Sequence, residues 1–181
     1  LVVGTGGVGS AVAPIAARRD FFERIVFSDL DPARPRALVE RLGDDRFGAA
    51  QLDASDAGAI AELARAERCD AILNAADPRF NPPIFQAGFD AGCTYLDMAM
   101  TLSDREGTKL GDLQFAQEAE WRERGLLALV GIGVEPGLSD VFARYAADHL
   151  FSEIDEVGVR DGADLVVDGY AFAPTFSIWT T

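Results

Sequence analysis

Residues 1–10 read LVVGTGGVGS, and this stretch decides which fold the rest of the sequence can adopt. Its first three residues are apolar, as expected for a buried strand. The spacing Gly4-x-Gly6-x-x-Gly9 follows, and apolar residues then recur at helical spacing. A strand, a glycine turn and a helix in this order form the element that holds the pyrophosphate of a dinucleotide. The sequence therefore predicts a dinucleotide-binding unit at its start.

Each glycine of this pattern has a separate expected task. Gly4 allows a tight turn, Gly6 lets the backbone approach the phosphates, and Gly9 lets the helix pack closely against its strand. The first helical residues, Gly7 and Val8, should present free N–H groups and the positive end of the helix dipole to the pyrophosphate. We therefore expect these five residues to contact the cofactor.

Asp29 ends the second apolar run and lies twenty residues after Gly9. An acidic side chain at this distance accepts hydrogen bonds from the adenosine ribose, and its charge repels a 2′-phosphate. NAD is therefore the favoured cofactor. Arg34 and Arg36 follow closely, so NADP remains open. Asp29 could also be an ordinary turn carboxylate before Asp31.

Composition narrows the classes of function. Of the 181 residues 49% are hydrophobic, which allows a sizeable core, and the net charge is −14 with an isoelectric point of about 4.3. An acidic chain repels nucleic acid and anionic membranes, so neither is an expected partner. No segment is apolar over the length of a bilayer. The two cysteines, Cys69 and Cys93, should stay reduced in a cytoplasmic protein, and a single histidine argues against a metal site.

Apolar runs alternate with helical patterns up to residue 150. Strands are expected near 1–4, 24–28, 47–52, 70–75, 93–97 and 126–131. Helices are expected near 7–19, 32–42, 56–66, 81–91, 111–124 and 137–149. This alternation predicts an α/β fold, a doubly wound parallel sheet of the Rossmann type. Pro14 falls inside the first helix, where we expect a kink.

The pattern changes after residue 150. Residues 1–150 are expected to form the NAD(P)-binding Rossmann domain, and residues 151–181 to form the beginning of a second, α+β domain for substrate binding and dimerisation. Since the first strand has no lead-in, we also expect further residues before Leu1. The helix at 137–149 carries an apolar stripe that includes Val141 and Phe142, which predicts that this face is buried.

Polar residues close several strands at the edge where ligands of such sheets bind. Asp53 should lie along the cofactor, and Asn74 and Ala75 near its nicotinamide end, although Asn74 could instead cap its strand. Tyr95 and Asp97 share one side of the fifth strand and are the candidate catalytic residues. Asp97 could bind a substrate amine, act as general base, or anchor a loop. A polar loop at 98–112 follows, and Asn81 is expected to cap the next helix.

Five segments, together with Asp29 at the acidic end of the second strand, resemble the saccharopine dehydrogenase family, in particular its carboxynorspermidine dehydrogenase group. These segments are GTGGVGS (4–10), NAAD (74–77), TYLDMA (94–99), GVEPGLSDVFARYAADHLF (133–151) and EIDEV (153–157). The resemblance implies a nicotinamide-dependent oxidoreductase that interconverts a secondary amine with an imine formed from an amine and a keto acid. It also implies a second domain that closes the substrate cleft and makes a homodimer.

Two other functions fit the glycine pattern. One is a non-catalytic, nucleotide-sensing Rossmann domain, which would normally be shorter and lack the helix at 137–149. The other is a dehydrogenase of hydroxy acids, which needs a well-placed histidine. His149 lies at the end of the last helix, far from the expected cleft.

Overall fold

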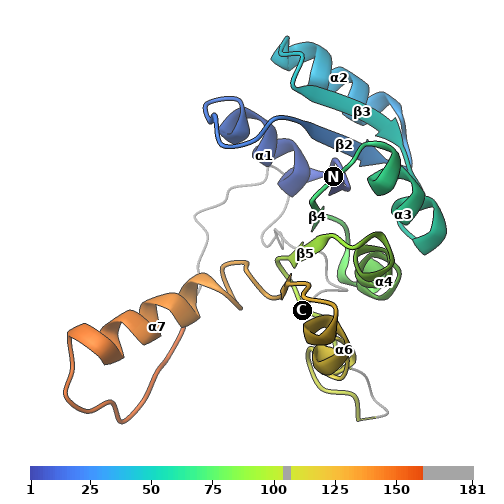
Figure 1. Cartoon of the computed structure of the whole chain (residues 1–181). Coiled ribbons are helices and arrows are strands. Elements are labelled where there is room, and N and C mark those ends of the chain that lie inside the picture. Colours follow the sequence, from blue (N-terminus) through green and yellow to red (C-terminus); the bar gives the residue numbers. More distant parts are fainter. Residues whose placement is uncertain (104–106, 161–181) are drawn as a thin grey trace, which may run out of the picture.

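The computed structural model describes residues 1–103 and 107–160 and contains a six-stranded parallel sheet in the order β3-β2-β1-β4-β5-β6 (Figure 1). The strands are β1 (Val2–Val3), β2 (Ile25–Asp29), β3 (Phe47–Gln51), β4 (Ala71–Asn74), β5 (Thr94–Asp97) and β6 (Ala128–Leu129). Each lies within about two residues of its expected position. The strand order reverses direction between β1 and β4, which is where a doubly wound sheet opens a crevice for its ligand. The predicted Rossmann architecture is confirmed.

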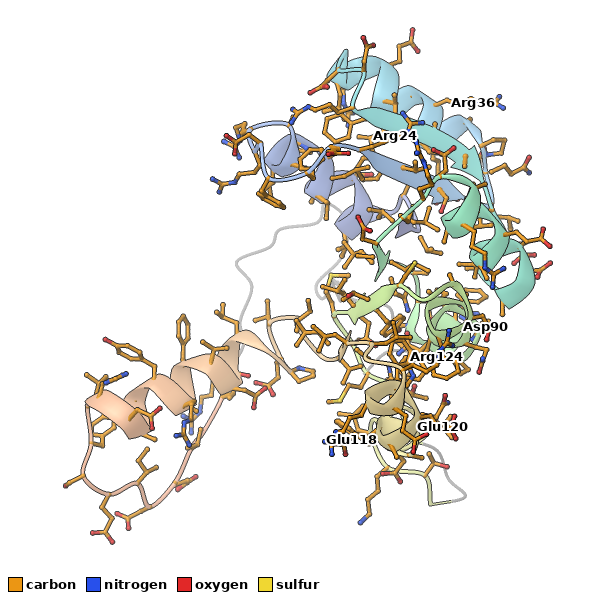
Figure 2. All side chains as sticks on the ribbon, viewed as in Figure 1. Arg24, Arg36, Asp90, Glu118, Glu120 and Arg124 are labelled. Atoms are coloured by element: carbon orange, nitrogen blue, oxygen red, sulfur yellow. The ribbon has the colours of Figure 1, made fainter. Side chains whose placement is uncertain are left out.

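Helices cover the sheet on two faces. The helices of the described residues are α1 (Gly7–Ala16), α2 (Ala33–Leu42), α3 (Ala57–Ala66), α4 (Asn81–Ala91), α5 (Asp112–Phe115), α6 (Glu118–Glu123) and α7 (Leu138–His149), with a 3₁₀ turn at Pro78–Phe80, and of these α7 does not lie on the sheet (Figure 1). The neighbouring residues Val2 and Val3 point to opposite faces. Val2 joins a cluster with α1 and α2, and Val3 joins a cluster with α3, α4 and α6. Charged side chains such as Asp90 on α4 point away from the sheet (Figure 2).

Two of the expected helices differ in extent from those in the structure. The helix expected at 111–124 is divided into α5 and α6, because the N–H of Gln117 bonds the carbonyl of Gln114 only three residues back, at 3.2 Å. This tighter turn interrupts the helical repeat. Helix α1 ends at Ala16, two residues after Pro14, whose missing N–H weakens the helix there. The kink expected at this proline stays a prediction.

Helix α7 forms as predicted, but the burial predicted for its apolar stripe is wrong for the described residues. Val141 and Phe142 are 62% and 64% exposed, and no residue of α7 is buried. Figure 1 shows why: α7 extends away from the sheet instead of lying on it. The expected start of a second domain falls largely at 161–181, outside the described residues. Across the part of the chain that the structure describes, no helix has the length and apolar character needed to cross a membrane.

Candidate functional site

The glycine turn is built as its spacing predicts. Gly4 has a φ of +98°, which favours glycine, and a Cβ added there would lie 2.8 Å from the carbonyl oxygen of Ala75. A Cβ on Gly9 would overlap the carbonyl oxygen of Gly4. Larger residues at either position would force apart β1, β4 and α1. The tight turn at Gly4 and the close helix packing at Gly9 are thus confirmed.

The N-terminus of α1 faces open space. Cβ atoms added to Gly6 and Gly7 would meet nothing within 4 Å, and the neighbouring Val8 is 48% exposed. The first turn of α1 carries no acidic side chain. The first N–H groups of a helix have no partner within it and carry partial positive charge. The residues at this end therefore fit a pyrophosphate.

Asp29 lies beside the glycine turn, at the carboxyl end of β2. Its Oδ2 accepts the N–H of Thr5 at 2.9 Å, and its Oδ1 accepts the N–H of Asp31 at 3.1 Å. Asp29 therefore makes the turn contact that the sequence left open and also holds the glycine turn in place. A carboxylate has about four acceptor positions, so capacity for ribose hydroxyls remains. The guanidinium of Arg34 lies 3.9 Å from Oδ2 and is more than half exposed.

Asp53 follows β3 at the same edge of the sheet. The N–H of Leu52 bonds the carbonyl of Asp29 at 3.0 Å, so the ends of β2 and β3 are adjacent. The carboxylate of Asp53 is exposed and accepts the N–H and hydroxyl of Ser55, which lower the pKa of Asp53. Its place along the cofactor stays a prediction.

Buried amides connect the ends of β4 and β5. The Nδ2 of Asn74 donates to Oδ1 of Asn81 at 2.7 Å and to the hydroxyl of Tyr95 at 3.2 Å, while its Oδ1 accepts the N–H of Ala76. The amide of Asn81 donates onward to the carbonyl of Ala99 at 2.7 Å. The cap expected at Asn81 is wrong: its side chain points into the protein and fastens the loop after β5. Asn74 caps its strand, the second of its two expected roles.

Asp97 closes this network at the end of β5. Its carboxylate is 1% exposed and accepts hydrogen bonds from Nε2 of Gln114, at 2.6 Å to Oδ2, and from the N–H of Gly131, at 2.7 Å to Oδ1. Burial raises the pKa of Asp97, and hydrogen bonds from Gly131, Gln114 and Tyr95 oppose the rise. Burial, and then the charge of Asp97, raise the pKa of Tyr95 well above its ordinary value.

The sequence places Tyr95 and Asp97 on the correct strand and side, but both side chains are enclosed by protein in this structure. The loop-anchoring alternative describes the contacts that Asp97 makes. A catalytic role for either residue requires contact with a substrate and stays a prediction.

Gln114 and Thr101 are members of this network that the sequence did not reveal. The Oε1 of Gln114 accepts both the N–H and the hydroxyl of Thr101, at 2.8 and 3.1 Å. Nothing in the local pattern marks either residue as buried. Within the described residues, no group of three or more His, Cys, Asp or Glu side chains is placed to hold a metal ion.

Comparison with known proteins places this geometry in a family. Residues 1–129 match the model of the saccharopine dehydrogenase NADP binding domain. The chain is 30% identical over 177 residues to a carboxyaminopropylagmatine dehydrogenase of Synechocystis sp., covering 98% of this chain and 44% of that protein. It is 29% identical over 174 residues to a carboxynorspermidine synthase of Vibrio cholerae, covering 89% of this chain and 42% of that protein. The chain thus spans less than half the length of these curated relatives.

A solved structure with the same fold is apo saccharopine dehydrogenase (L-Glu forming) from Saccharomyces cerevisiae. The TM-score is 0.67 at 18% identity, over 82% of this chain and 30% of that one. Scyllo-inositol dehydrogenase from Lactobacillus casei, solved with NAD(H), follows with a TM-score of 0.56 at 17% identity, over 81% and 39% of the two chains. At these identities the likeness concerns the fold.

Proposed function

Because the chain belongs to the family of saccharopine dehydrogenase NADP-binding domains, we propose that it is the cofactor-binding part of an oxidoreductase that acts on C–N bonds. The observation that carries the proposal is the carboxyl edge of the sheet. An uncrowded helix N-terminus and the acidic Asp29 meet there in a chain of which 98% aligns with a carboxyaminopropylagmatine dehydrogenase. The nicotinamide would supply or accept a hydride.

The proposed reaction joins an amine to a carbonyl compound. Loss of water gives an imine, and addition of a hydride to its carbon and a proton to its nitrogen gives a secondary amine. The names of the two relatives both denote carboxylated amines, which supports a cationic amine and a keto acid as the substrate pair. The net charge of −14 would attract a cationic amine to this protein.

The cofactor residues divide between the two ends of the edge. We propose that Gly6, Gly7 and Val8 bind the pyrophosphate through their N–H groups, and that Gly4 and Gly9 shape the turn. The adenosine ribose and adenine would lie against Asp29 and Asp53. The main chain of Ala75 would border the nicotinamide ribose, and the side chain of Asn74 would hold this part of the main chain in place. This set comprises Gly4, Gly6, Gly7, Val8, Gly9, Asp29, Asp53, Asn74 and Ala75.

We propose that Tyr95 and Asp97 act at the nicotinamide end as positioning residues, because both are enclosed by protein. Contact between Asp97 and a substrate amine would require Gln114 or Gly131 to release one of its oxygens. For the cofactor we propose that Asp29 favours NAD, and that the exposed Arg34 beside it allows NADP to bind as well. We also propose a homodimer, which rests on the family resemblance. A cytoplasmic location is proposed as well, and it rests on the two reduced cysteines.

The proposal is tested with the full-length natural protein. Cofactor affinity is measured first, with NADH and NADPH. Oxidation of the reduced cofactor is then followed by absorbance with pairs of amines and keto acids. Turnover with at least one pair is expected. Cofactor binding without turnover of any pair would instead support the nucleotide-sensing alternative, and absence of binding would overturn both functions.

A further inference from the structure

The buried amide of Gln114 joins two segments that are distant from it in sequence. Its Nε2 donates to Oδ2 of Asp97 at 2.6 Å, and its Oε1 accepts two hydrogen bonds from Thr101. The side chain of Gln114 is only 5% exposed. With two donors on the oxygen side and a carboxylate on the nitrogen side, the amide can adopt only one orientation. Gln114 therefore ties α5 to the end of β5 and to the loop that follows it.

Asp97 carries this connection across to the loop after β6. Its Oδ1 accepts the N–H of Gly131 at 2.7 Å, and its main-chain oxygen accepts the N–H of Ile132 at 2.9 Å. Gly131 has a φ of +68°, and a Cβ there would lie 3.2 Å from the side chain of Met100. The carboxylate of Asp97 thus holds the loops after β5 and β6 against each other, and its second oxygen accepts the hydrogen bond from Gln114.

These two loops stand at the carboxyl ends of β5 and β6, on the side of β4 opposite to the glycine turn and Asp29. In a doubly wound sheet the dinucleotide extends along this edge, with its adenosine half over β1 to β3 and its nicotinamide half over β4 to β6. A change in the loops after β5 and β6 therefore affects the nicotinamide half of the ligand and leaves the adenosine half in place.

We propose that Gln114 is a positioning residue for the nicotinamide half of the dinucleotide, a role that rests on the proposed function. Acting through Asp97, it sets the separation of the loops that border the nicotinamide and its ribose. The bonds that it makes are matched in polarity: an amide donor meets a carboxylate, and an amide acceptor meets the donors of Thr101. This matching can be inverted by exchanging the two side-chain types.

The exchange gives a three-variant test. Q114E places a carboxylate against the carboxylate of Asp97. D97N replaces one of the two acceptor oxygens by an amide nitrogen, which then faces the donor of Gln114 or of Gly131. In D97N/Q114E the new amide nitrogen at position 97 can donate to the new carboxylate at position 114. That carboxylate still accepts from Thr101, and the new amide oxygen accepts from Gly131. The double variant therefore restores the hydrogen-bond pattern that each single variant breaks.

The matched control lies on the surface of α4. Nε2 of Gln86 donates to Oδ1 of Asp90 at 2.8 Å, and Asp90 lies on the surface (Figure 2), so Q86E alters the same kind of glutamine–carboxylate pair at an exposed place. The ligands are the reduced cofactor, NADH or NADPH, that the natural protein binds more tightly, and ADP, which carries only the adenosine half. Dissociation constants are measured by calorimetry on the full-length natural protein.

Q114E is expected to raise the dissociation constant of the reduced cofactor about tenfold, since a buried bond is replaced by repulsion, while affinity for ADP stays unchanged. D97N/Q114E should return most of the lost affinity, and Q86E should have no effect. If Q114E does not fold, Q114N replaces it: its shorter side chain cannot reach both Asp97 and Thr101, and the same selective loss is expected.

Three results would overturn the inference. One is unchanged cofactor affinity in the Gln114 variants, the second is an equal loss for ADP, and the third is no recovery in the double variant. In each of these cases the natural protein still binds its cofactor, so the proposed function stands. Absence of cofactor binding by the natural protein would overturn the proposed function and this inference together.

Discussion

The contact of Gly9 with the glycine turn allows a quantitative test of how α1 is seated. A Cβ added to Gly9 would overlap the carbonyl oxygen of Gly4, whereas one added to Gly7 would meet nothing within 4 Å. The substitutions Gly9→Ala and Gly7→Ala therefore add the same methyl group to the same helix, two residues apart. The obstacle at position 9 is main chain, which cannot rotate away as a side chain can.

The two substitutions should change stability in opposite directions. Forcing a methyl group into a filled space costs about 1–3 kcal/mol. At Gly7, whose backbone is helical, alanine restricts the unfolded chain and stabilises by about 0.4–1 kcal/mol. The restriction of the unfolded chain applies to both substitutions and cancels between them, so the unfolding free energies of the two variants should differ by about 1–3 kcal/mol, with Gly9→Ala the less stable.

The measurement is urea denaturation of the natural protein and of both variants without cofactor. Fluorescence is a suitable signal because Trp121 is buried against Phe85 in the core. Circular dichroism at the same urea concentrations checks that the transitions coincide. Equal stability of the two variants would show that α1 is not packed against β1 as described, and the account of the pyrophosphate site would fail with it.

Two further predictions concern charge. Arg34→Gln should weaken the binding of NADP about tenfold relative to that of NAD, because a bond to a charged phosphate is lost. Arg36→Gln, on the exposed side of α2, should leave the ratio of the two dissociation constants unchanged (Figure 2). Calorimetry with both cofactors measures this ratio, and an unchanged ratio in the Arg34 variant would exclude that arginine as a phosphate ligand. Burial raises the pKa of Asp97 above the ordinary 3.8, so its buried charge penalises the folded state above that raised pKa and the penalty disappears as the pH falls towards 3.8. The stability of the natural protein relative to Asp97→Asn should therefore increase on acidification, and denaturation at several pH values that gave a constant or falling difference would contradict this.

Much of the fold could be predicted because it depends on local patterns. The runs Ala71–Asn74 and Thr94–Asp97 are short and bounded by turn residues, and strands buried on both faces need little else. The spacing from Gly4 to Gly9 specifies a turn through main-chain geometry alone. Asp29 is recognisable because its distance from the glycines reflects one complete βαβ unit.

The division into α5 and α6 and the exposure of α7 could not be predicted in the same way. Both halves of the 111–124 segment have helical propensity. The hydrogen bond of Gln117 spans three residues instead of four, and the apolar pattern does not indicate this change. The stripe that contains Phe142 indicates that this face of α7 suits burial. It does not indicate which part of a protein would bury it, because amphipathic patterning carries no information about the partner.

The two ends of the proposed cofactor site therefore differ in how sequence encodes them. At the adenosine end, Gly4 and Gly9 act through sterics within a few residues of each other, so residue types and spacing suffice. At the nicotinamide end, Asp97 finds its partners 17 and 34 residues away, in Gln114 and Gly131. Such pairs depend on how loops meet after the sheet has formed, and no periodicity predicts them. Substitutions at the first end should consequently be tolerated according to size, and those at the second end according to whether a donor still faces an acceptor.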